Sequence, residues 1–441
     1  MLNYYLTLAL RSLKRNVVLT VLMIAAIGVG IGASMTTLTM FRAMAGDPIP
    51  NKSRQLFAVQ IDNWGPSKKF AIGGDKDNLQ EQISYPDAIG LMKAHAAHRQ
   101  SAMYATGFAL TPSNPDLRPF QVQARAAYAD FFPMFEVPFR YGAAWTPADD
   151  DAHADVVVIS HDLNDKVFGG ANSVGKTLNL DGHEYRVVGV LDRWEPTPKF
   201  YDLNNDKYGK PEEAFIPFTR AIDQQLASWG NNNCNGDTPP VPGWEGRIHS
   251  ECIWLQFWAE LPTAADVEHY RAFLNNYVAE QRRLGRFHWA PNTRIRNARE
   301  WLAYEHAVST EVRILVLVSF SFLAVCLLNA MGLMLAKIMG RAGDIGVRRA
   351  LGASRRAIFG QCLIEAGVVG LAGGLLGLAL TALGLAGLHS LLSDEVNRLT
   401  HFSMSDVAIA VALSVVATVL AGLYPTWRAA QVQPAWQLKA Q

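Results

Sequence analysis

The chain has 441 residues, of which 50% are hydrophobic and 18% are charged, and its formal net charge is +1. This length is too great for one ordinary domain, and the apolar fraction excludes a purely soluble protein. The near-neutral charge gives no indication of nucleic-acid binding, because the basic residues form clusters beside apolar runs.

Residues 1–16 have the pattern of an amphipathic helix, with leucines on one side and basic residues supplying the charge. The leucines are Leu2, Leu6, Leu10 and Leu13, and the basic residues are Arg11, Lys14 and Arg15. Such a helix lies in the interface of a membrane. The alternative is a simple basic flank of the apolar run that follows.

Four apolar runs are long enough to cross a membrane, which takes about 20 residues. We expect transmembrane helices at 17–41, 313–336, 357–392 and 407–425, the last ending at Pro425 because proline does not continue a helix comfortably. The first run is too long for the apolar part of a signal peptide and lacks a cleavage site, so we expect it to be retained.

Small residues in two of these runs favour close helix packing. In the first run Gly28 and Gly32 are four residues apart, and their partner is either a second subunit or another helix of this chain. The third run holds overlapping pairs of the same kind: Gly370, Gly373, Gly374 and Gly377.

Glu365 lies inside the third run, where a carboxylate is costly and normally faces a partner. One interpretation is a contact that transmits movement from the preceding basic loop. The other is an interfacial ion pair with a nearby cation: Arg355, Arg356 or Lys337.

The flanking charges predict the orientation of the spans. Basic residues precede the first span, fill the loop 337–356 and follow the fourth span. Both termini, including the tail 426–441, and that loop are therefore expected in the cytoplasm. Residues 42–312 and the loop 393–406 are expected outside.

The external segment 42–312 mixes strand and helix patterns. Residues 156–160 are a short apolar run, and residues 177–191 alternate about an Asp-Gly turn, which predicts a β-hairpin. Residues 85–95 and 266–284 have helical patterns. The predicted fold class is therefore a membrane protein with four transmembrane α-helices and a large α+β extracytoplasmic domain between spans 1 and 2.

Residues 199–250 are rich in Asn, Gly, Pro and Asp, which indicates a long loop or an added module. Cys234 and Cys252 are candidates for a disulfide, because the outside is oxidising in most bacteria. Four tryptophans gather in and after this segment: Trp229, Trp244, Trp254 and Trp258. They form either a surface for a partner or ordinary aromatic packing.

No enzymatic or metal site is predicted. Residues 170–177 match the phosphate-loop pattern G-x-x-x-x-G-K-[ST], but a strand pattern follows where a phosphate loop needs a helix. Ser160, His161 and Asp162 are merely adjacent, with no nucleophile elbow. No cysteine and histidine spacing supports a metal, and we expect no catalytic residue in this chain.

The loop 337–356 is strongly cationic, with six basic residues against Asp344 alone. An apolar spacing predicts one short helix that Gly352 ends, and Ser354 can cap the next helix. One interpretation is a topology-setting loop with a solvated charged face. The other is a helix that contacts a partner.

The string DIGVRRALGASRRAIFGQCLIEAGVVGLAGGLLG at 344–377 resembles the permease domain of the MacB/FtsX family of ABC transporters. SYPDAIGLM, FFPMFEVPFRYGAAW and the 156–191 segment resemble its periplasmic domain. The resemblance implies an elbow helix at 1–16, a coupling helix at 337–356, and a porter-like lobe with a second lobe inserted at roughly 193–260. It also favours Gly28 and Gly32 as a subunit interface.

The resemblance further implies an inner-membrane permease subunit that works as a dimer, identical or not, above an ABC ATPase dimer that binds ATP and Mg²⁺, with no cofactor in this chain. ATP-driven movement of the coupling helices would change the shape of the periplasmic domains and drive export of a periplasmic or membrane-derived substrate. In this family the substrate usually does not pass through the membrane core. A periplasmic adaptor is a further expected partner. The expected ATPase contacts are Asp344, Ile345, Arg348, Arg349 and Leu351, shaped by Gly343 and Gly346.

Two other functions stay open at this point. An FtsX-like regulator would control cell-wall enzymes in the periplasm and transport nothing. A sensory module of the peptide-antibiotic type normally has about ten spans, against four expected here. The sequence specifies neither the substrate nor the direction of transport.

Overall fold

The computed structural model describes residues 16–65, 79–234, 241–391 and 404–430. The chain divides into two compact units, 1–45 with 308–441 and 46–307. The predicted elbow helix at 1–16, the loop 393–406 and the tail 426–441 lie largely outside the described residues.

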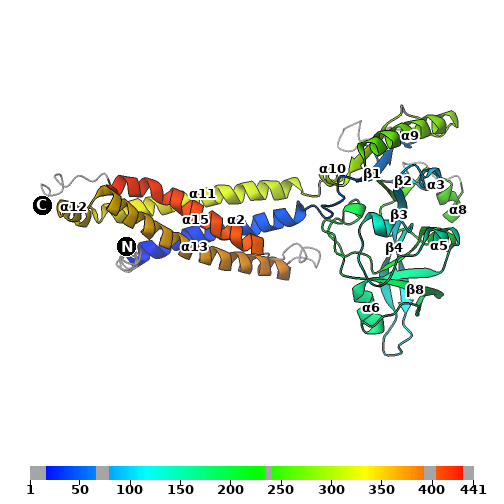
Figure 1. Cartoon of the computed structure of the whole chain (residues 1–441), viewed down its shortest axis with the longest axis horizontal. Helices are drawn as coiled ribbons and strands as arrows, with labels where there is room; N and C mark the ends of the chain where they lie inside the picture. Colours follow the sequence, from blue (N-terminus) through cyan, green and yellow to red (C-terminus); the bar gives the residue numbers. More distant parts are fainter. Residues whose placement is uncertain (1–15, 66–78, 235–240, 392–403, 431–441) are drawn as a thin grey trace. The chain divides into compact units, whose positions relative to one another are not determined.

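The first unit is a bundle of long apolar helices, two of which are connected by one short helix (Figure 1). The long helices are α2 (Val17–Met44), α11 (Thr310–Met339), α13 (Arg355–Leu391) and α15 (Met404–Ala430), and the short one is α12 (Ala342–Ala350). All four long helices contain segments long and apolar enough to cross a membrane. The prediction that the fourth span ends at Pro425 was wrong, because α15 continues through that proline to Ala430.

Glycines allow α2 and α13 to approach closely. A Cβ added at Gly28 would lie 2.7 Å from the Leu376 side chain, and one added at Gly377 would lie 2.7 Å from Ile31. Gly32 faces Leu380 in the same way. Our expectation that Gly28 and Gly32 form a subunit interface was therefore wrong, since α13 of the same chain occupies that face of α2.

The other small residues of α13 face two different helices. Gly373 packs against Ile27 of α2, whereas Gly370 and Gly374 face Thr418 and Ser414 of α15. The Ser414 hydroxyl donates to the Gly370 carbonyl at 2.7 Å. These glycines thus let α13 pack between α2 and α15.

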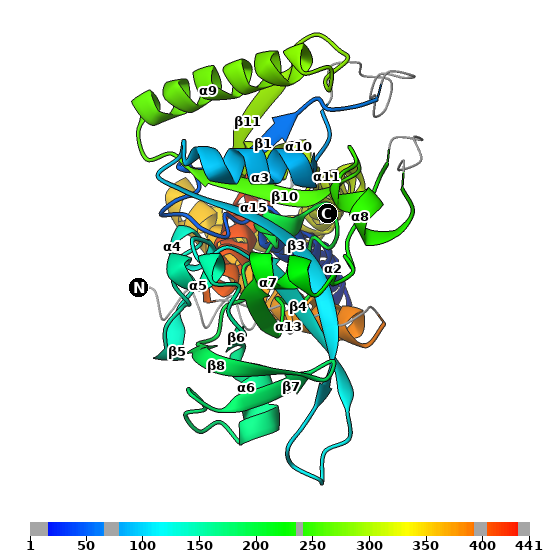
Figure 2. The same cartoon turned by 90° about the vertical axis from the view of Figure 1, so that its right-hand side faces the viewer.

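The second unit contains one mixed sheet with helices around it (Figure 2). Its strands are β1 (Leu56–Ile61), β2 (Ile83–Ser84), β3 (Arg99–Thr111), β4 (Phe120–Ala127), β5 (Phe139–Gly142), β6 (Val156–Ile159), β7 (Thr177–Leu180), β8 (His183–Leu191), β9 (Ala214–Pro217), β10 (Ile253–Glu260) and β11 (Thr293–Asn297). The order is β11-β1-β10-β3-β4-β9-β6-β8-β5, with β2 on β10 and β7 on β3 and β8.

The helices of this unit are α3 (Tyr85–Ala94), α4 (Phe131–Met134), α5 (Pro147–Asp151), α6 (His161–Phe168), η1 (Phe200–Asp202), α7 (Phe218–Asp223), α8 (Gly243–Ile248), α9 (Ala264–Arg283) and α10 (Ala298–Tyr304). Ser84 caps α3, and Thr263 with Asp266 forms a capping box on α9. In Figure 2, α3 and α9 lie near one end of the sheet, and α6, β7 and β8 lie near the other.

The strands β1, β6, β9 and β10 are buried on both faces of the sheet. Every residue of β1 is buried, with Phe57 and Val59 in one apolar core and Leu56 and Ala58 in another. The predicted hairpin is β7–β8, and its turn residues Asp181 and Gly182 have φ values of 50° and 85°. Two positive φ values in succession match a turn that follows the twist of the paired strands.

The predicted lobe at roughly 193–260 was placed wrongly. These residues supply β9, which lies between β4 and β6, and β10, which lies between β1 and β3. They therefore form central strands of the common sheet and no separate lobe. Pairing between strands this far apart in the chain leaves no local mark in the sequence.

A buried ionic network holds the chain between β8 and β9. Arg125 on β4 donates from Nε to Glu212 at 2.9 Å and also pairs with Asp202. The Lys199 ammonium lies 2.8 Å from Glu212. Burial alone would raise the pKa of Glu212, but Arg125 and Lys199 lower it to about 2. The predicted long loop is thus anchored at 199–212.

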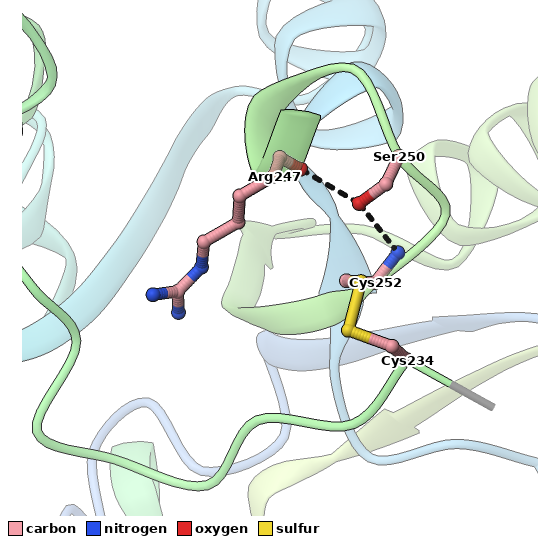
Figure 3. Close-up of a disulfide and its surroundings, with 4 residues drawn as sticks. All are labelled: Cys234, Arg247, Ser250 and Cys252. Atoms are coloured by element: carbon pink, nitrogen blue, oxygen red, sulfur yellow. Dashed lines mark hydrogen bonds between the residues drawn. A yellow bond between two sulfur atoms is a disulfide. The ribbon is translucent and has the colours of Figure 1, made fainter. Parts of the chain in front are cut away.

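Cys234 and Cys252 form a disulfide in the structure (Figure 3). Beside it, the Ser250 hydroxyl accepts from the Cys252 amide at 3.2 Å and donates to the Arg247 carbonyl at 2.8 Å. The bond fastens the segment after α7 to the start of β10. Ser250 and Arg247 hold the return of the chain into that strand.

The positions of the tryptophans favour ordinary aromatic packing, and not a surface for a partner. Trp254 and Trp258 are buried on β10, and Trp244 meets Trp254 with ring centroids 5.9 Å apart. Trp229 is 50% exposed, yet its ring covers Gly107, where an added Cβ would lie 2.0 Å away. Gly107 therefore has a packing reason to lack a side chain.

Candidate functional site

The helix α12 is an amphipathic helix of nine residues between α11 and α13. It ends at Gly352, whose φ of +98° suits glycine, and the Ala353 amide donates back to the Arg348 carbonyl at 3.0 Å. The Ser354 hydroxyl accepts from the Ala357 amide at 3.2 Å and so caps α13. The cationic stretch 337–356 is thus one short helix with the ends of two long ones, and not a single helix.

Apolar side chains on and beside α12 are exposed. Leu351 is 83% exposed and Val347 is 57% exposed, with Arg348 and Asp344 also on the surface. The surrounding basic residues keep this stretch out of the hydrocarbon of a bilayer. Leu351 and Val347 therefore face either water or another protein, and burial of such side chains on a partner is favourable.

The predicted contact residues divide into three groups. Asp344, Arg348 and Leu351 are exposed, whereas Ile345 and Arg349 are half-buried. Gly346 is buried, so it shapes the packing of α12 from behind. A Cβ added at Gly343 would meet nothing within 4 Å, and nothing in the structure explains a glycine there.

An ionic network lies behind α12. The Lys337 ammonium at the end of α11 is 2.5 Å from Glu365 on α13, and Arg341 is 3.6 Å from the other oxygen of Glu365. Lys337 also donates to the Thr20 hydroxyl of α2 at 3.4 Å. Of the three cations considered for Glu365, the structure thus pairs it with Lys337. The sequence analysis did not predict the contacts of Arg341 and Thr20. The spacing could have indicated Arg341, because residues four apart on a helix are neighbours and Arg341 follows Lys337 by four residues.

A cavity of about 90 Å³ lies between α11, α12 and α13. Ile345 and Arg348 line it from α12, and Cys362 lines it from α13. Arg348 reaches over to Gln361, with 3.1 Å between Nη1 and Oε1.

The structure does not make a phosphate-binding site of residues 170–177, the other motif considered above. Residues 170–177 follow α6 and end in the first residue of β7, so a strand and not a helix follows these glycines. Within the described parts of the chain, no group of three or more His, Cys, Asp or Glu residues is placed to hold a metal ion.

Comparison with known proteins identifies the family. The model of the MacB-like periplasmic core domain matches residues 20–275, and that of the FtsX-like permease C-terminal domain matches residues 316–434. The chain belongs to the MacB/FtsX family of ABC-transporter permeases. The second match contains α12 and the Lys337–Glu365 pair, and the first contains most of the sheet.

Relatives of this MacB/FtsX-family permease include proteins called macrolide export ATP-binding/permease protein MacB. Those of Salmonella paratyphi A and Escherichia coli K12 are each 24% identical, over 97% and 98% of this chain and 59% and 60% of the relative. That of Agrobacterium fabrum is 27% identical over 69% of this chain and 41% of the relative. The chain thus spans less than two thirds of the length of these relatives.

Two solved structures are also similar to this MacB/FtsX-family permease. The periplasmic region of MacB from Actinobacillus actinomycetemcomitans covers 57% of this chain and 92% of its own, with 13% identity and a TM-score of 0.36. The extracellular domain of the ABC-type transporter YknZ from Gram-positive bacteria covers 55% and 100%, with 11% identity and a TM-score of 0.34.

Family membership gives the general role and location of the protein. The protein is a transmembrane component of an ABC transporter. It lies in the inner membrane through the apolar helices, four of them in the described part of the chain, and residues 46–307 form its periplasmic unit.

Proposed function

We propose that this permease works with a separate ATPase polypeptide that docks on α12. The exposure of Leu351 and Val347 beside Arg348 carries this proposal, since it gives α12 an apolar and cationic face that the bundle leaves uncovered. ATP and Mg²⁺ bind to that ATPase. Both termini and α12 then lie in the cytoplasm, as the clusters of basic residues favour.

Movement of α12 passes to the long helices through the network behind it. Because Lys337 and Arg341 both pair with Glu365, a shift of α12 reaches the end of α11 and the first turns of α13 together. The helices carry that shift across the membrane and change the shape of the periplasmic unit. This cycle drives export of a periplasmic or membrane-derived substrate, with a second permease copy and a periplasmic adaptor as further partners.

The relatives named for macrolide export make macrolides the first substrates to assay. Export requires the whole assembly, so the assay uses cells that produce the permease with its ATPase. A strain lacking the permease should become more sensitive to an exported macrolide. Restoration by the wild-type chain, but not by an α12 variant, would tie export to α12.

Charge reversal on α12 tests the docking proposal. The double variant Arg348→Glu with Arg349→Glu should abolish co-purification of the ATPase and stimulation of its activity. The matched control is Arg355→Glu with Arg356→Glu, which changes the net charge equally at two exposed positions of α13. Equal ATPase binding by the α12 variant and the wild type would remove α12 from the mechanism.

A further inference from the structure

A cleft of about 550 Å³ lies within the periplasmic unit. The helix α3 lines one part of it, and α5 and α7 line another, with the chain after β4 between them. Cavities of roughly 300–1,000 Å³ hold small-molecule ligands in proteins. No residue of this cleft belongs to the ATPase-docking site or to the membrane unit.

Three aromatic rings form an apolar wall of the cleft. Phe218 is fully buried, and its ring is nearly parallel to those of Tyr85 and Tyr128, with interplanar angles of 11° and 20°. The ring centroids of Tyr128 and Phe218 are 5.2 Å apart. Both tyrosines are only partly buried. Such a wall suits a flat apolar group, and the negative face of an aromatic ring attracts a cation.

The polar lining of the cleft is mainly acidic. Its carboxylates are Asp130, Asp150, Asp151 and Asp223, against one lysine, Lys93, and two histidines, His95 and His153. His153 already pairs with Asp223 at 2.5 Å. The cleft therefore has an excess of negative charge at neutral pH.

The carboxylates of Asp150 and Asp130 accept hydrogen bonds from uncharged donors. The Asp150 carboxylate accepts from the Ala129 amide at 2.8 Å and from the Trp145 indole at 2.9 Å. The Asp130 carboxylate accepts a hydrogen bond from the backbone amide of Gln100 at 3.0 Å. Burial and the charges of Asp130 and Asp151 raise the pKa of Asp150 to about 7, against those two hydrogen bonds. A cation in the cleft would favour the ionised carboxylate.

The side-chain oxygen of Gln100 is a hydrogen-bond acceptor that no donor of the described residues reaches. Its side chain lines the cleft and is 2% exposed. Its amide nitrogen donates to the carbonyls of Leu91 and Met92 at 2.9 and 2.8 Å, which fixes the side chain, while its Oε1 has no partner among the described residues. Leaving a buried acceptor unbonded is unfavourable, so a ligand N–H group that reaches Oε1 would be stabilised.

We propose that this cleft binds an organic cation with a flat apolar body. The flat body packs on Tyr85 and Tyr128, and the protonated nitrogen lies near Asp130 and Asp150. Both carboxylates line the same cleft as Tyr85, Tyr128 and Gln100, so they surround the space that one ligand would occupy. This site goes beyond docking of the ATPase and does not depend on it.

The test uses the full-length protein in lipid nanodiscs without nucleotide. Tryptamine, a flat ammonium compound, is titrated by calorimetry beside its neutral counterpart tryptophol, and empty nanodiscs provide the baseline. We expect tryptamine to bind at least about tenfold more tightly than tryptophol, the ratio that a modest charge interaction gives. Equal affinities, or no binding of tryptamine, would overturn the proposal.

Variants then locate the binding. Asp150→Asn should weaken tryptamine binding at least about tenfold and leave tryptophol unchanged, whereas Glu268→Gln on the exposed surface of α9 should change neither. Because Asp150 also holds Ala129 and Trp145, a second variant, Ile89→Trp, fills the cleft from α3 and should abolish binding of both compounds. Undiminished tryptamine binding by a folded Ile89→Trp protein would place the ligand elsewhere and refute this site.

Discussion

The Lys337 ammonium lies 2.5 Å from the Glu365 carboxylate, and the two side chains are only 3% and 12% exposed. Removing one partner of such a pair leaves the other charge buried and costs up to about 3–5 kcal/mol, whereas replacing both can cost far less. Arg341, 3.6 Å from Glu365, reduces the cost of removing Lys337. Lys337→Met or Glu365→Leu alone should therefore destabilise the permease more than the double variant. Thermal unfolding of the purified variants measures this, and additive effects of the two substitutions would contradict a direct pairing.

Packing of α2 on α13 makes Gly377 sensitive to a single methyl group. Gly377→Ala would bring a Cβ to 2.7 Å from Ile31, and overpacking of this kind costs about 1–3 kcal/mol. The control is Gly367→Ala on the same helix, where the new Cβ meets nothing within 4 Å. If Gly377→Ala dissociated permease dimers without lowering the unfolding temperature, Gly377 would belong to a subunit interface after all.

The disulfide should stabilise the periplasmic unit. Cys234 and Cys252 are 18 residues apart, and closing a loop of that size contributes roughly 3 kcal/mol in the chain-entropy model. Replacing both by serine, or adding a reductant, should lower the unfolding temperature. Cys326→Ala serves as the control because that cysteine is free. An unchanged unfolding temperature after complete reduction, verified by thiol counting, would show that the bond contributes nothing.

Glu305 should make stability depend on pH. It follows α10, is 7% exposed, and its Oε1 has no partner among the described residues. Burial and the charge of Glu81 raise its pKa from 4.5 to about 8, against Lys207 and Arg296. Between these values the folded chain binds a proton that the unfolded chain has lost, so the fold loses stability as pH rises through this window.

Glu305→Gln removes that titration. The free energy of unfolding of the variant should rise relative to the wild type between pH 5 and pH 9, by on the order of 2 kcal/mol. Glu268→Gln, at a carboxylate that is 71% exposed, should show no such trend. Denaturant unfolding at several pH values measures the difference. A constant difference across this range would mean that Glu305 is ionised throughout.

Local patterns predicted much of this fold because their physical causes are local. The apolar runs, the Asp181-Gly182 turn and the Gly352 and Ser354 caps each depend on residues close together in the chain. The partner of Gly28 could not be predicted in this way, since one small-residue pair suits any close helix. The continuation of α15 through Pro425 likewise depends on its surroundings in the bundle.

The two candidate sites differ in how far the sequence revealed them. The exposed face of α12 lies in one short stretch, and its cationic pattern was visible. The cleft joins Tyr85, Tyr128, Asp150 and Phe218, which only the pairing of distant strands brings together. Since β9 pairs in parallel with β4, no turn in the sequence marks that arrangement.

Photo-crosslinking from Leu351 tests the central claim most directly. A benzophenone-bearing amino acid at position 351, on the exposed end of α12, should form an adduct with the ATPase when the two proteins are produced together and irradiated. The same amino acid in place of Leu328, which is 63% exposed on the apolar part of α11, should form none. Absence of the adduct at 351, or labelling of that position by a membrane-impermeant reagent from the periplasm, would contradict docking of the ATPase on α12.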